Sequence, residues 1–424
     1  MDNLFSSRFV FDDASDVEAK ICIVGVGGGG GNAINNMVAQ GIHGVEFIAV
    51  NTDAQALTMN RAPKKIQAGR GLTKGLGAGA RPSVGAEAIE ENREQIEQAL
   101  SGFDMVFITA GMGGGTGTGG APVVAAIARR LGILSVSIVT KPFDCEGPRR
   151  LKAADQGIQA LKETVDTLIV IPNERLLDIS EDDTSLIDAF GMADEVLYNA
   201  TRGISDLITV HGLINLDFAD VKTTMQNGGK ALMGAATASG EKRAERAAIE
   251  AISSPLLDGL SIAGARNVLV NITAGLSLGI KEATEATSII QREAGEDVEV
   301  IFGTVIDESM GDDIRVTVIA TGFEKEAEQA TGRRPSVALA VDNPVFNYKG
   351  EENLRQLDVP AYQRRVQGPK PVISTEREEQ EVPDDVPSGP RRIRRLQVDD
   401  LKDRAERIRK DDPDTPAFLR KMLD

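Results

Sequence analysis

Two glycine-dense segments contain the residue types best suited to chemistry in this sequence. Gly25–Asn32 is GVGGGGGN and Gly111–Gly120 is GMGGGTGTGG. Each segment follows an apolar run typical of a buried strand and precedes apolar residues at helical spacing. Glycines at such turns allow successive backbone N–H groups to point at an anion beside a helix N-terminus. The two segments therefore predict a cradle for the phosphates of one nucleotide, in preference to two flexible connectors.

The class of nucleotide remains open on the first segment alone. Gly25, Gly27 and Gly30 satisfy the G-x-G-x-x-G fingerprint of dinucleotide-binding folds, and Asp53 follows the next strand at about the expected distance. A Rossmann oxidoreductase is therefore one candidate. It predicts NAD binding, although no acid or base for hydride transfer is evident.

The second segment differs from that fingerprint. Thr116 and Thr118 lie between its glycines and offer phosphate both hydroxyl and amide donors. A Walker P-loop is excluded, because the sequence contains no G-x-x-x-x-G-K-[ST]. The most similar stretch, Gly69–Gly79, has these residues in the wrong order.

Composition narrows the possible functions. With 424 residues and 41% hydrophobic residues, the chain can form two or three domains with full cores. A net charge of −17 and 4% aromatic residues argue against nucleic-acid binding. No apolar run is long enough to span a membrane, and residues 1–16 lack a signal-peptide core. We expect a cytoplasmic protein in which Cys22 and Cys145 are reduced thiols.

The order of strand and helix signals predicts an α/β fold. Between Lys20 and about Ile171 the two alternate, which implies a parallel sheet whose ligand site lies at the carboxyl ends of the strands. The predicted strands lie near Ile21, Phe47, Val106, Val136 and Leu168, with a helix at residues 85–100.

A second, smaller α/β domain with a mixed sheet is predicted beyond a long central helix at about Thr184–Thr209. Its expected strands are residues 267–273, 298–306 and 312–320, around a helix at 280–294. After Phe323 the chain is polar and rich in Pro and charged residues, which is typical of a disordered linker. The expected parts are an N-terminal extension (1–19), a nucleotide-binding domain (20–183), a central helix (184–210), a second domain (211–323), a linker (324–413) and a tail peptide (414–424).

The segment GGGTGTG at Gly113–Gly119 resembles the signature of the tubulin/FtsZ GTPase family. Five further segments resemble that family in the same order along the chain. They are Asn51–Leu57, Leu72–Gly85, Thr140–Arg150, Ile171–Leu176 and Asn215–Lys222. The resemblance covers about Lys20–Phe323 and resumes at the extreme C-terminus. It implies a tubulin-like fold that binds GTP or GDP.

The resemblance also implies roles for individual residues. Those expected at the phosphates are Gly28, Gly29, Gly30, Gly31, Asn32, Gly115, Thr116 and Gly117, with Ala78 and Gly79 near the terminal phosphate. Glu146 and Arg150 are expected at the ribose and phosphates, and Asn173, Phe190 and Asp194 at the base. A carboxylate accepting from guanine N1 and its exocyclic amine distinguishes GTP from ATP, because adenine lacks that pair of donors. Asp194 is therefore the expected base selector.

Hydrolysis is assigned to Asn215, Asp217 and Asp220. Their spacing alone favours an ordinary helix cap. By resemblance, however, this loop enters the nucleotide pocket of a neighbouring subunit in a head-to-tail filament, so GTP is hydrolysed at the interface between successive subunits. Mg²⁺ bound to the phosphates is implied, without a metal site made by the protein itself. A nucleotide-binding scaffold without hydrolysis is the remaining alternative, which Asp217 and Asp220 disfavour.

The family resemblance extends to a cellular role at the midcell division ring of a bacterium. In the tail peptide, Phe418, Leu419, Met422 and Leu423 can share one helix face. Residues Asp414 to Asp424 are expected to bind membrane-tethering and regulatory division proteins. The basic run Arg391–Arg395 is either a solvated charge cluster or a contact with acidic lipids.

Overall fold

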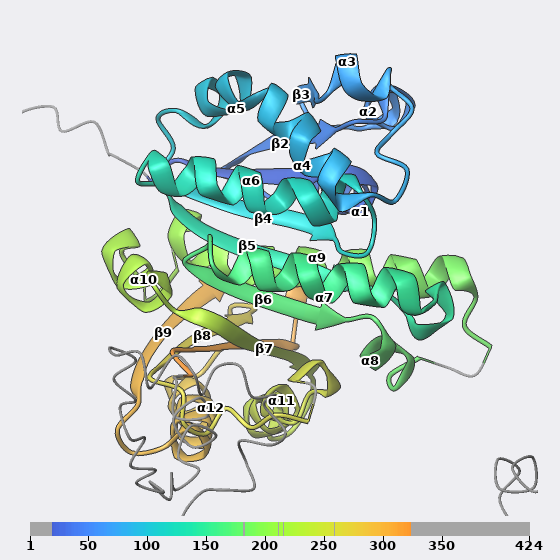
Figure 1. Cartoon of the computed structure of the whole chain (residues 1–424). Coiled ribbons are helices and arrows are strands. Elements are labelled where there is room, and N and C mark those ends of the chain that lie inside the picture. The colour runs from blue at the N-terminus through green and yellow to red at the C-terminus, as the bar shows by residue number, and fades with distance from the viewer. Residues whose placement is uncertain (1–18, 181–182, 211, 215, 258, 324–424) are drawn as a thin grey trace, which may run out of the picture. The chain divides into compact units, whose positions relative to one another are not determined.

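A ten-stranded sheet forms the centre of the structure, a computed structural model that describes residues 19–180, 183–210, 212–214, 216–257 and 259–323. The strand order is β3-β2-β1-β4-β5-β6-β7-β10-β8-β9 (Figure 1). The strands are β1 (Ile21–Val26), β2 (Val45–Asn51), β3 (Lys64–Gln67), β4 (Met105–Gly111), β5 (Leu134–Lys141), β6 (Thr167–Pro172), β7 (Gly229–Ala238), β8 (Asn267–Ala274), β9 (Glu299–Ile306) and β10 (Ile314–Thr321).

The first six strands in chain order are parallel to their neighbours, which brings their carboxyl ends to one edge. The remaining strands form a mixed arrangement, because β10 is antiparallel to both β7 and β8 whereas β8 and β9 are parallel. The two halves join where Thr167–Ile169 of β6 pair in parallel with Gly229–Ala231 of β7. The predicted α/β fold is confirmed, and the mixed strands of its second part continue the parallel sheet through β7 instead of forming a separate sheet.

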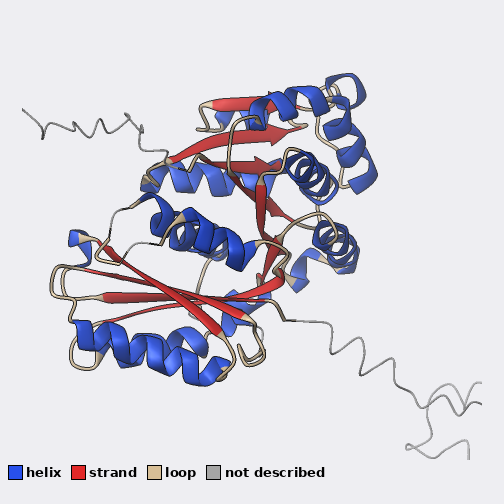
Figure 2. Cartoon of the chain, turned by 90° about the vertical axis from the view of Figure 1, so that its left-hand side faces the viewer, coloured by secondary structure: helices blue, strands red, loops and turns tan. Residues whose placement is uncertain are grey.

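Helices cover both faces of the parallel half (Figure 2). The helices are α1 (Gly27–Gln40), α2 (Ala54–Met59), α3 (Arg70–Thr73), α4 (Pro82–Glu91), α5 (Arg93–Leu100), α6 (Thr116–Arg130), α7 (Pro148–Lys162), α8 (Glu174–Leu177), α9 (Leu186–Thr209), α10 (Phe218–Met225), α11 (Arg243–Ile252) and α12 (Ile280–Ala294).

Alternation along β1 sets the two layers. Ile21 and Ile23 face the core formed with α1, α9 and α10, while Cys22 and Val24 face the core formed with α4, α5, α6 and α7. A strand buried on both faces needs apolar side chains at every position, which explains the continuous apolar runs of the sequence. A third core lies under α11 and α12, which cover the mixed strands.

Close backbone contacts hold the two glycine turns together. A Cβ at Gly25 would lie 2.4 Å from the carbonyl oxygen of Gly30, and one at Gly30 would lie 2.3 Å from that of Thr109 on β4. Gly27 has a φ of +76°, and a Cβ there would lie 2.7 Å from the amide nitrogen of Gly117. Glycine is required at these positions by approach distance and by backbone conformation.

Helix boundaries agree closely with the sequence prediction in two places and differ in a third. The central helix α9 begins after Ser185, whose Oγ accepts from the Asp188 amide, and α12 has the predicted bounds. The single helix predicted at 85–100 is instead two helices that meet at Asn92. The side-chain oxygen of Asn92 accepts from the Gly69 amide 2.9 Å away, so this residue leaves the helical conformation to support the loop after β3.

The strands β3 and β7 and the helices α7 and α11 were not predicted. The two strands lack strong apolar alternation, whereas α11 is clearly amphipathic and its pattern was missed. The predicted linker, the tail peptide and most of the N-terminal extension lie outside the described residues. In the part of the chain that is described, no helix has the length and apolar character needed to cross a membrane.

Gly119 on α6 is expected to be intolerant of any side chain. A Cβ there would lie 1.8 Å from the carbonyl oxygen of Pro82 on α4, so Gly119→Ala must push the two helices apart. We expect the free energy of unfolding to fall by about 2 kcal/mol, measured by urea denaturation followed by circular dichroism. The control is Gly191→Ala on α9, where no atom lies within 4 Å of the added Cβ and stability should hold or rise. Equal stability of both variants would contradict the close approach of α4 and α6.

Candidate functional site

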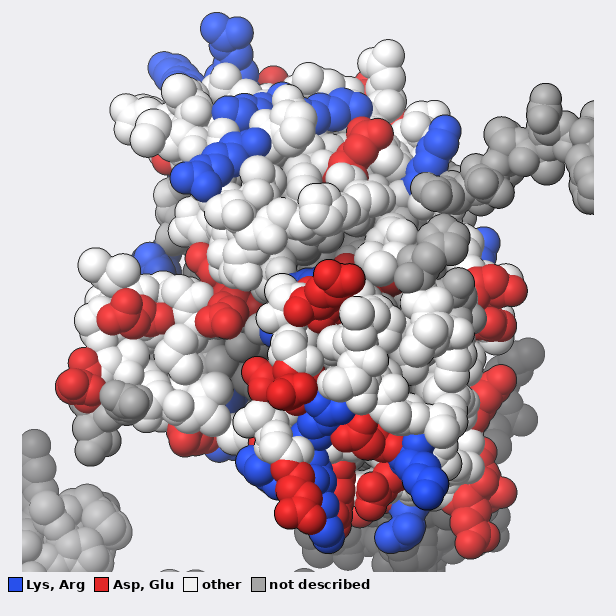
Figure 3. Space-filling view, turned by 180° about the vertical axis from the view of Figure 1, so that it is seen from behind, with Lys and Arg blue, Asp and Glu red and all other residues white. Residues whose placement is uncertain are grey.

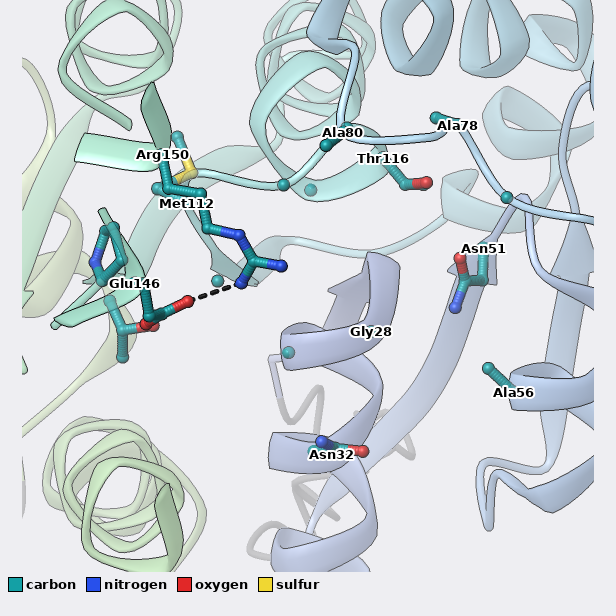
Figure 4. A pocket seen from close by; sticks show the side chains of 18 of the residues that line it. Gly28, Asn32, Asn51, Ala56, Ala78, Ala80, Met112, Thr116, Glu146 and Arg150 are labelled. Atoms are coloured by element: carbon teal, nitrogen blue, oxygen red, sulfur yellow. Dashed lines mark hydrogen bonds and ion pairs between the residues drawn. The ribbon is translucent and has the colours of Figure 1, made fainter. Parts of the chain in front are cut away.

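A cavity of about 590 Å³ lies at the carboxyl ends of the parallel strands (Figure 4). It is lined by both glycine turns, by the loop before α4, by the loop after β5 and by one side of α9. This is the edge at which ligands bind in open parallel sheets. Its lining is mostly polar or glycine, as a site for a charged ligand requires.

The floor of the cavity consists of two helix N-termini. Gly28 and Gly29 open α1, while Gly115, Thr116 and Gly117 open α6, and all five line the cavity. Neither helix has a side-chain cap or an acidic residue in its first turn. Their first N–H groups therefore remain available, and the two helix dipoles favour negative charge between them.

The loop before α4 closes over this floor. Ala78 and Gly79 line the cavity, and a Cβ on Gly115 would lie 2.7 Å from the Cβ of Ala78. The hydroxyls of Thr52 and Thr116 are hydrogen-bonded at 2.6 Å, which ties the end of β2 to the start of α6. The segments after β1, β3 and β4 thus surround one space, in which Figure 4 labels Gly28, Ala78 and Thr116.

One side wall carries an ion pair. Arg150 Nη1 donates to Glu146 Oε2 at 2.6 Å, and Glu146 Oε1 accepts from the Phe143 amide at 3.1 Å (Figure 4). The arginine side chain is 54% exposed and the glutamate 16%. Glu146 is therefore fixed from both sides, while Arg150 remains accessible to a phosphate or ribose in the cavity.

The far end of the cavity offers acceptors without partners. Asn173, directly after β6, is buried, and its Oδ1 has no hydrogen-bond partner among the described residues. Asp194 on α9 has its pKa raised to about 6 by burial. Phe190, one turn earlier, packs edge-on against Phe143 with ring centroids 5.3 Å apart. One buried and one half-buried acceptor beside an aromatic ring suit a flat ligand edge that presents N–H donors.

Most residues expected at the nucleotide line this cavity. Those that do are Gly28, Gly29, Asn32, Ala78, Gly79, Gly115, Thr116, Gly117, Glu146, Arg150, Asn173, Phe190 and Asp194. Gly30 instead packs on Thr109, and Gly31 lines a neighbouring hollow of about 120 Å³ together with Gly28 and Asn32. The first turn thus serves both as a cradle and as a packing surface.

Several lining residues were not assigned from the sequence, among them Asn51, Thr140 and Leu197, and Asp53, named only for the dinucleotide alternative, also lines the cavity. Asn51 is the last residue of β2, and a polar residue at the carboxyl end of a parallel strand is the feature that could have identified it as part of the site. Asp53 Oδ1 accepts from the amides of Gln55 and Ala56 at the start of α2. A helix cap therefore accounts for Asp53 without the ribose contact of a dinucleotide fold.

The predicted catalytic acids do not line the cavity. Asp217 caps α10, where its Oδ1 accepts from the Asp220 amide at 2.9 Å, and both side chains are exposed. Asn215 lies outside the described residues. The helix α9 runs from the cavity, at Asp194, for fifteen residues to Thr209, about 22 Å. The α10 loop therefore lies at the opposite edge of the parallel sheet (Figure 1).

The donor set of the cavity does not form a metal cage. Within the described ranges, no group of three or more His, Cys, Asp or Glu side chains could hold a metal ion. Mg²⁺ fits this site only as a partner of phosphate oxygens that keeps several waters, as it commonly does beside nucleotides.

Comparisons with known proteins agree on one family. Residues 20–181 match the tubulin/FtsZ family GTPase domain, and residues 229–324 match the FtsZ family C-terminal domain. An FtsZ dimer from M. jannaschii is 46% identical, with a TM-score of 0.71, covering 73% of this chain and 90% of that one. A point mutant of FtsZ from M. jannaschii is 47% identical, with a TM-score of 0.70 and coverage of 72% and 91%.

A more distant structure shares the fold. CetZ1 from Haloferax volcanii, bound to GDP, is 23% identical with a TM-score of 0.63, covering 74% of this chain and 97% of its own. The family matches replace the dinucleotide-binding alternative with a tubulin-like GTPase domain. The chain therefore belongs to the FtsZ family of the tubulin/FtsZ GTPases.

Proposed function

We propose that this GTPase assembles head to tail into filaments and hydrolyses GTP at each junction between subunits. The observation that supports this most strongly is the separation of the cavity from Asp217 along α9. The cavity and the acids face opposite edges of the parallel sheet, so a second copy stacked on the first would supply the acids. A repeated contact of this kind forms an open filament.

In the proposed complex, the phosphates of GTP lie between the N-termini of α1 and α6. Ala78 and Gly79 approach the terminal phosphate, and Arg150 contacts the ribose and phosphate side. Guanine lies against Phe190 and donates from N1 and the exocyclic amine to Asp194 and Asn173. The buried Oδ1 of Asn173, which finds no hydrogen-bond partner in the described ranges, supports this placement, because an acceptor of that kind is costly unless a ligand satisfies it.

The proposed hydrolytic step uses water held by the incoming loop. Asp217 and Asp220 of the next subunit orient the water for in-line attack and accept its proton, and Asn215 completes this polar set. The Asp217 carboxylate already accepts from the Asp220 amide, which fixes its orientation before assembly. Mg²⁺ on the phosphates, when bound, neutralises charge that develops in the transition state.

Exposed apolar side chains near both ends of α9 support burial against another subunit. Leu186 and Ile187, at the start of α9, are 63% and 83% exposed, and Leu213, beside the α10 loop, is 72% exposed. Apolar side chains at both ends of α9 favour a contact that removes them from water. In this proposal the filament assembles at the midcell division ring, and residues 414–424 recruit membrane-tethering and regulatory division proteins.

A mixing experiment tests the shared site. Asp217→Asn keeps the helix cap and removes the carboxylate charge, so it should bind GTP normally and turn it over about a hundredfold more slowly. Asp194→Ala should lose GTP binding but keep an intact α10 loop. Each variant alone should be nearly inactive, whereas a mixture should hydrolyse GTP at junctions that combine the pocket of the first with the acids of the second. Phosphate release is the measurement.

The control is Asp217→Ala, which loses the cap as well as the charge and should be less stable than Asp217→Asn while equally slow. For the unmodified chain, hydrolysis per molecule should disappear below the concentration at which polymer sediments. Normal turnover by Asp217→Asn, or a mixture no faster than its components, would mean that each subunit hydrolyses GTP by itself.

Asp194 should make GTP binding dependent on pH. Its pKa is raised to about 6, and only the ionised carboxylate accepts from both guanine donors, so affinity should fall as pH falls below about 6. The weakening should approach tenfold for each further pH unit. The dissociation constant of a fluorescent GTP analogue, measured by titration at several values between about pH 5 and pH 8, tests this effect.

The matched variant is Asp194→Asn. Its amide can accept from N1–H and donate to a 2-oxo group, so it should favour xanthosine triphosphate over GTP. The binding of GTP by this variant should also depend little on pH between about pH 5 and pH 8, because the amide does not titrate there. An unchanged preference for GTP would place the base contact elsewhere.

A further inference from the structure

The outer strand β3 forms one free edge of the sheet. It consists of Lys64–Gln67 and is the first strand in the sheet order, paired on one side with β2. An edge strand presents unpaired backbone N–H and C=O groups to whatever lies beside it. We call β3 and the flanking side chains of Arg61 and Arg70 the basic edge.

Positive charge at the basic edge is not neutralised by the described residues. Arg61, Lys64, Lys65 and Arg70 are all exposed, and no described carboxylate forms an ion pair with them. Lys64 Nζ donates to the carbonyl of Ala99 at 3.1 Å, a neutral partner. No acidic residue occurs in the sequence between positions 53 and 87, although the whole chain has a net charge of −17.

The same surface is visible in the space-filling view. Lysine and arginine side chains gather at the top of Figure 3, over the part of the molecule where Figure 1 places β3 and α3. Acidic side chains are more frequent over the rest of that face. The basic edge is therefore a local exception on an acidic molecule, and it favours a partner with negative charge.

An exposed apolar side chain adjoins this charge. Met59, at the end of α2, is 79% exposed, and Lys65 Nζ lies 3.4 Å from the carbonyl oxygen of Thr58, the residue before it. A partner that pairs with β3 would cover Met59 with its own side chains. The partner that fits is thus extended, acidic and partly apolar.

Residues 1–18 of the chain, which lie outside the described residues, have this chemistry. They contain five acidic residues and one cation, Arg8. Phe9, Val10 and Phe11 are strong strand formers and directly precede Asp12 and Asp13. The acids of this segment are complementary in charge to the lysines of β3. Its aromatic residues are suited to cover the exposed side chain of Met59.

The point of attachment places this segment within reach. The described chain begins two strands from β3, because β1 pairs with β2 and β2 with β3. A strand added outside β3 lies three spacings, about 14 Å, from β1. Lys64 is opposite Ile48, three residues further along the sheet than the start of β1, so the total distance is about 17 Å. The six residues 13–18 span up to about 20 Å when extended.

We propose that residues 1–18 dock on the basic edge, with residues 9–13 paired to β3 as an added strand. The added strand is antiparallel to β3, because it must lead back to the edge at which β1 begins. Asp12 and Asp13 then lie near Lys64 and Lys65, and one of the two phenylalanines faces Met59. Attachment to β1 keeps the segment at high local concentration, so modest contacts suffice.

Hydrogen–deuterium exchange of the full chain, with GDP and below the assembly concentration, tests the proposal. Deleting residues 2–18 should make the β3 amides exchange about fivefold to tenfold faster, as expected for the loss of edge hydrogen bonds. A synthetic peptide of residues 1–18, added to the shortened chain, should restore the slow exchange. High salt should weaken that effect.

Charge reversal provides the matched comparison. K64E/K65E should speed β3 exchange as the deletion does, and adding D12K/D13K in the same chain should restore it. The control is K152E/K162E on α7, which makes the same change of net charge at exposed positions elsewhere and should leave β3 unaffected. If K64E/K65E only destabilised β3, adding D12K/D13K would not slow the exchange of the β3 amides again.

Other occupants give different results. If the lysines only guard the edge against aggregation, the deletion will leave β3 exchange unchanged and K64E/K65E will increase self-association. If the acidic run at residues 376–385 occupies the edge, carbodiimide will cross-link it, and not Asp12 or Asp13, to Lys64. If the occupant is nucleic acid, β3 will be protected only after an oligonucleotide is added. Each of these three results would overturn the proposal.

Discussion

The architecture of the site depends on direct contact between two glycine backbones. Gly30 lies against the carbonyl of Thr109, and Gly27 lies against the amide of Gly117, so β1, α1, β4 and α6 meet with almost no side chain between them. This contact brings two helix N-termini to one point. Any Cβ at these positions would separate the turns and with them the two sets of N–H groups that face the cavity.

The parts of the fold that could be predicted are those in which local and tertiary preferences agree. Buried parallel strands such as β4 must be apolar throughout, and an amphipathic helix such as α12 carries its own periodicity and capping signals. β3 was missed because it is a four-residue edge strand with two lysines, and β7 because its small residues pack under helices without a strong alternation. The break at Asn92 depends on a hydrogen bond to Gly69, which lies twenty-three positions away and leaves no local signal.

The residues of the site likewise divide into those that local sequence predicts and those that only the assembled fold brings together. The glycine turns could be placed from the chain alone, since their conformational demands are local. Assignments such as Asn173 and Asp194 came from resemblance, because nothing in their local sequence distinguishes them from exposed polar residues. The additional lining by Asn51 and Leu197 depends on how β2 and α9 approach the cavity, and only the assembled sheet places them there.

In the proposed head-to-tail filament, the separation of the cavity from the α10 loop gives the polymer two chemically different ends. One terminal subunit would present a nucleotide that no incoming acid can reach, while the other would present acids with no nucleotide to act on. Such a filament would have one fewer hydrolysing junction than it has subunits. Under the same proposal, the nucleotide at the open end would remain GTP for as long as it stays terminal, so the bound nucleotides would record the direction of the polymer.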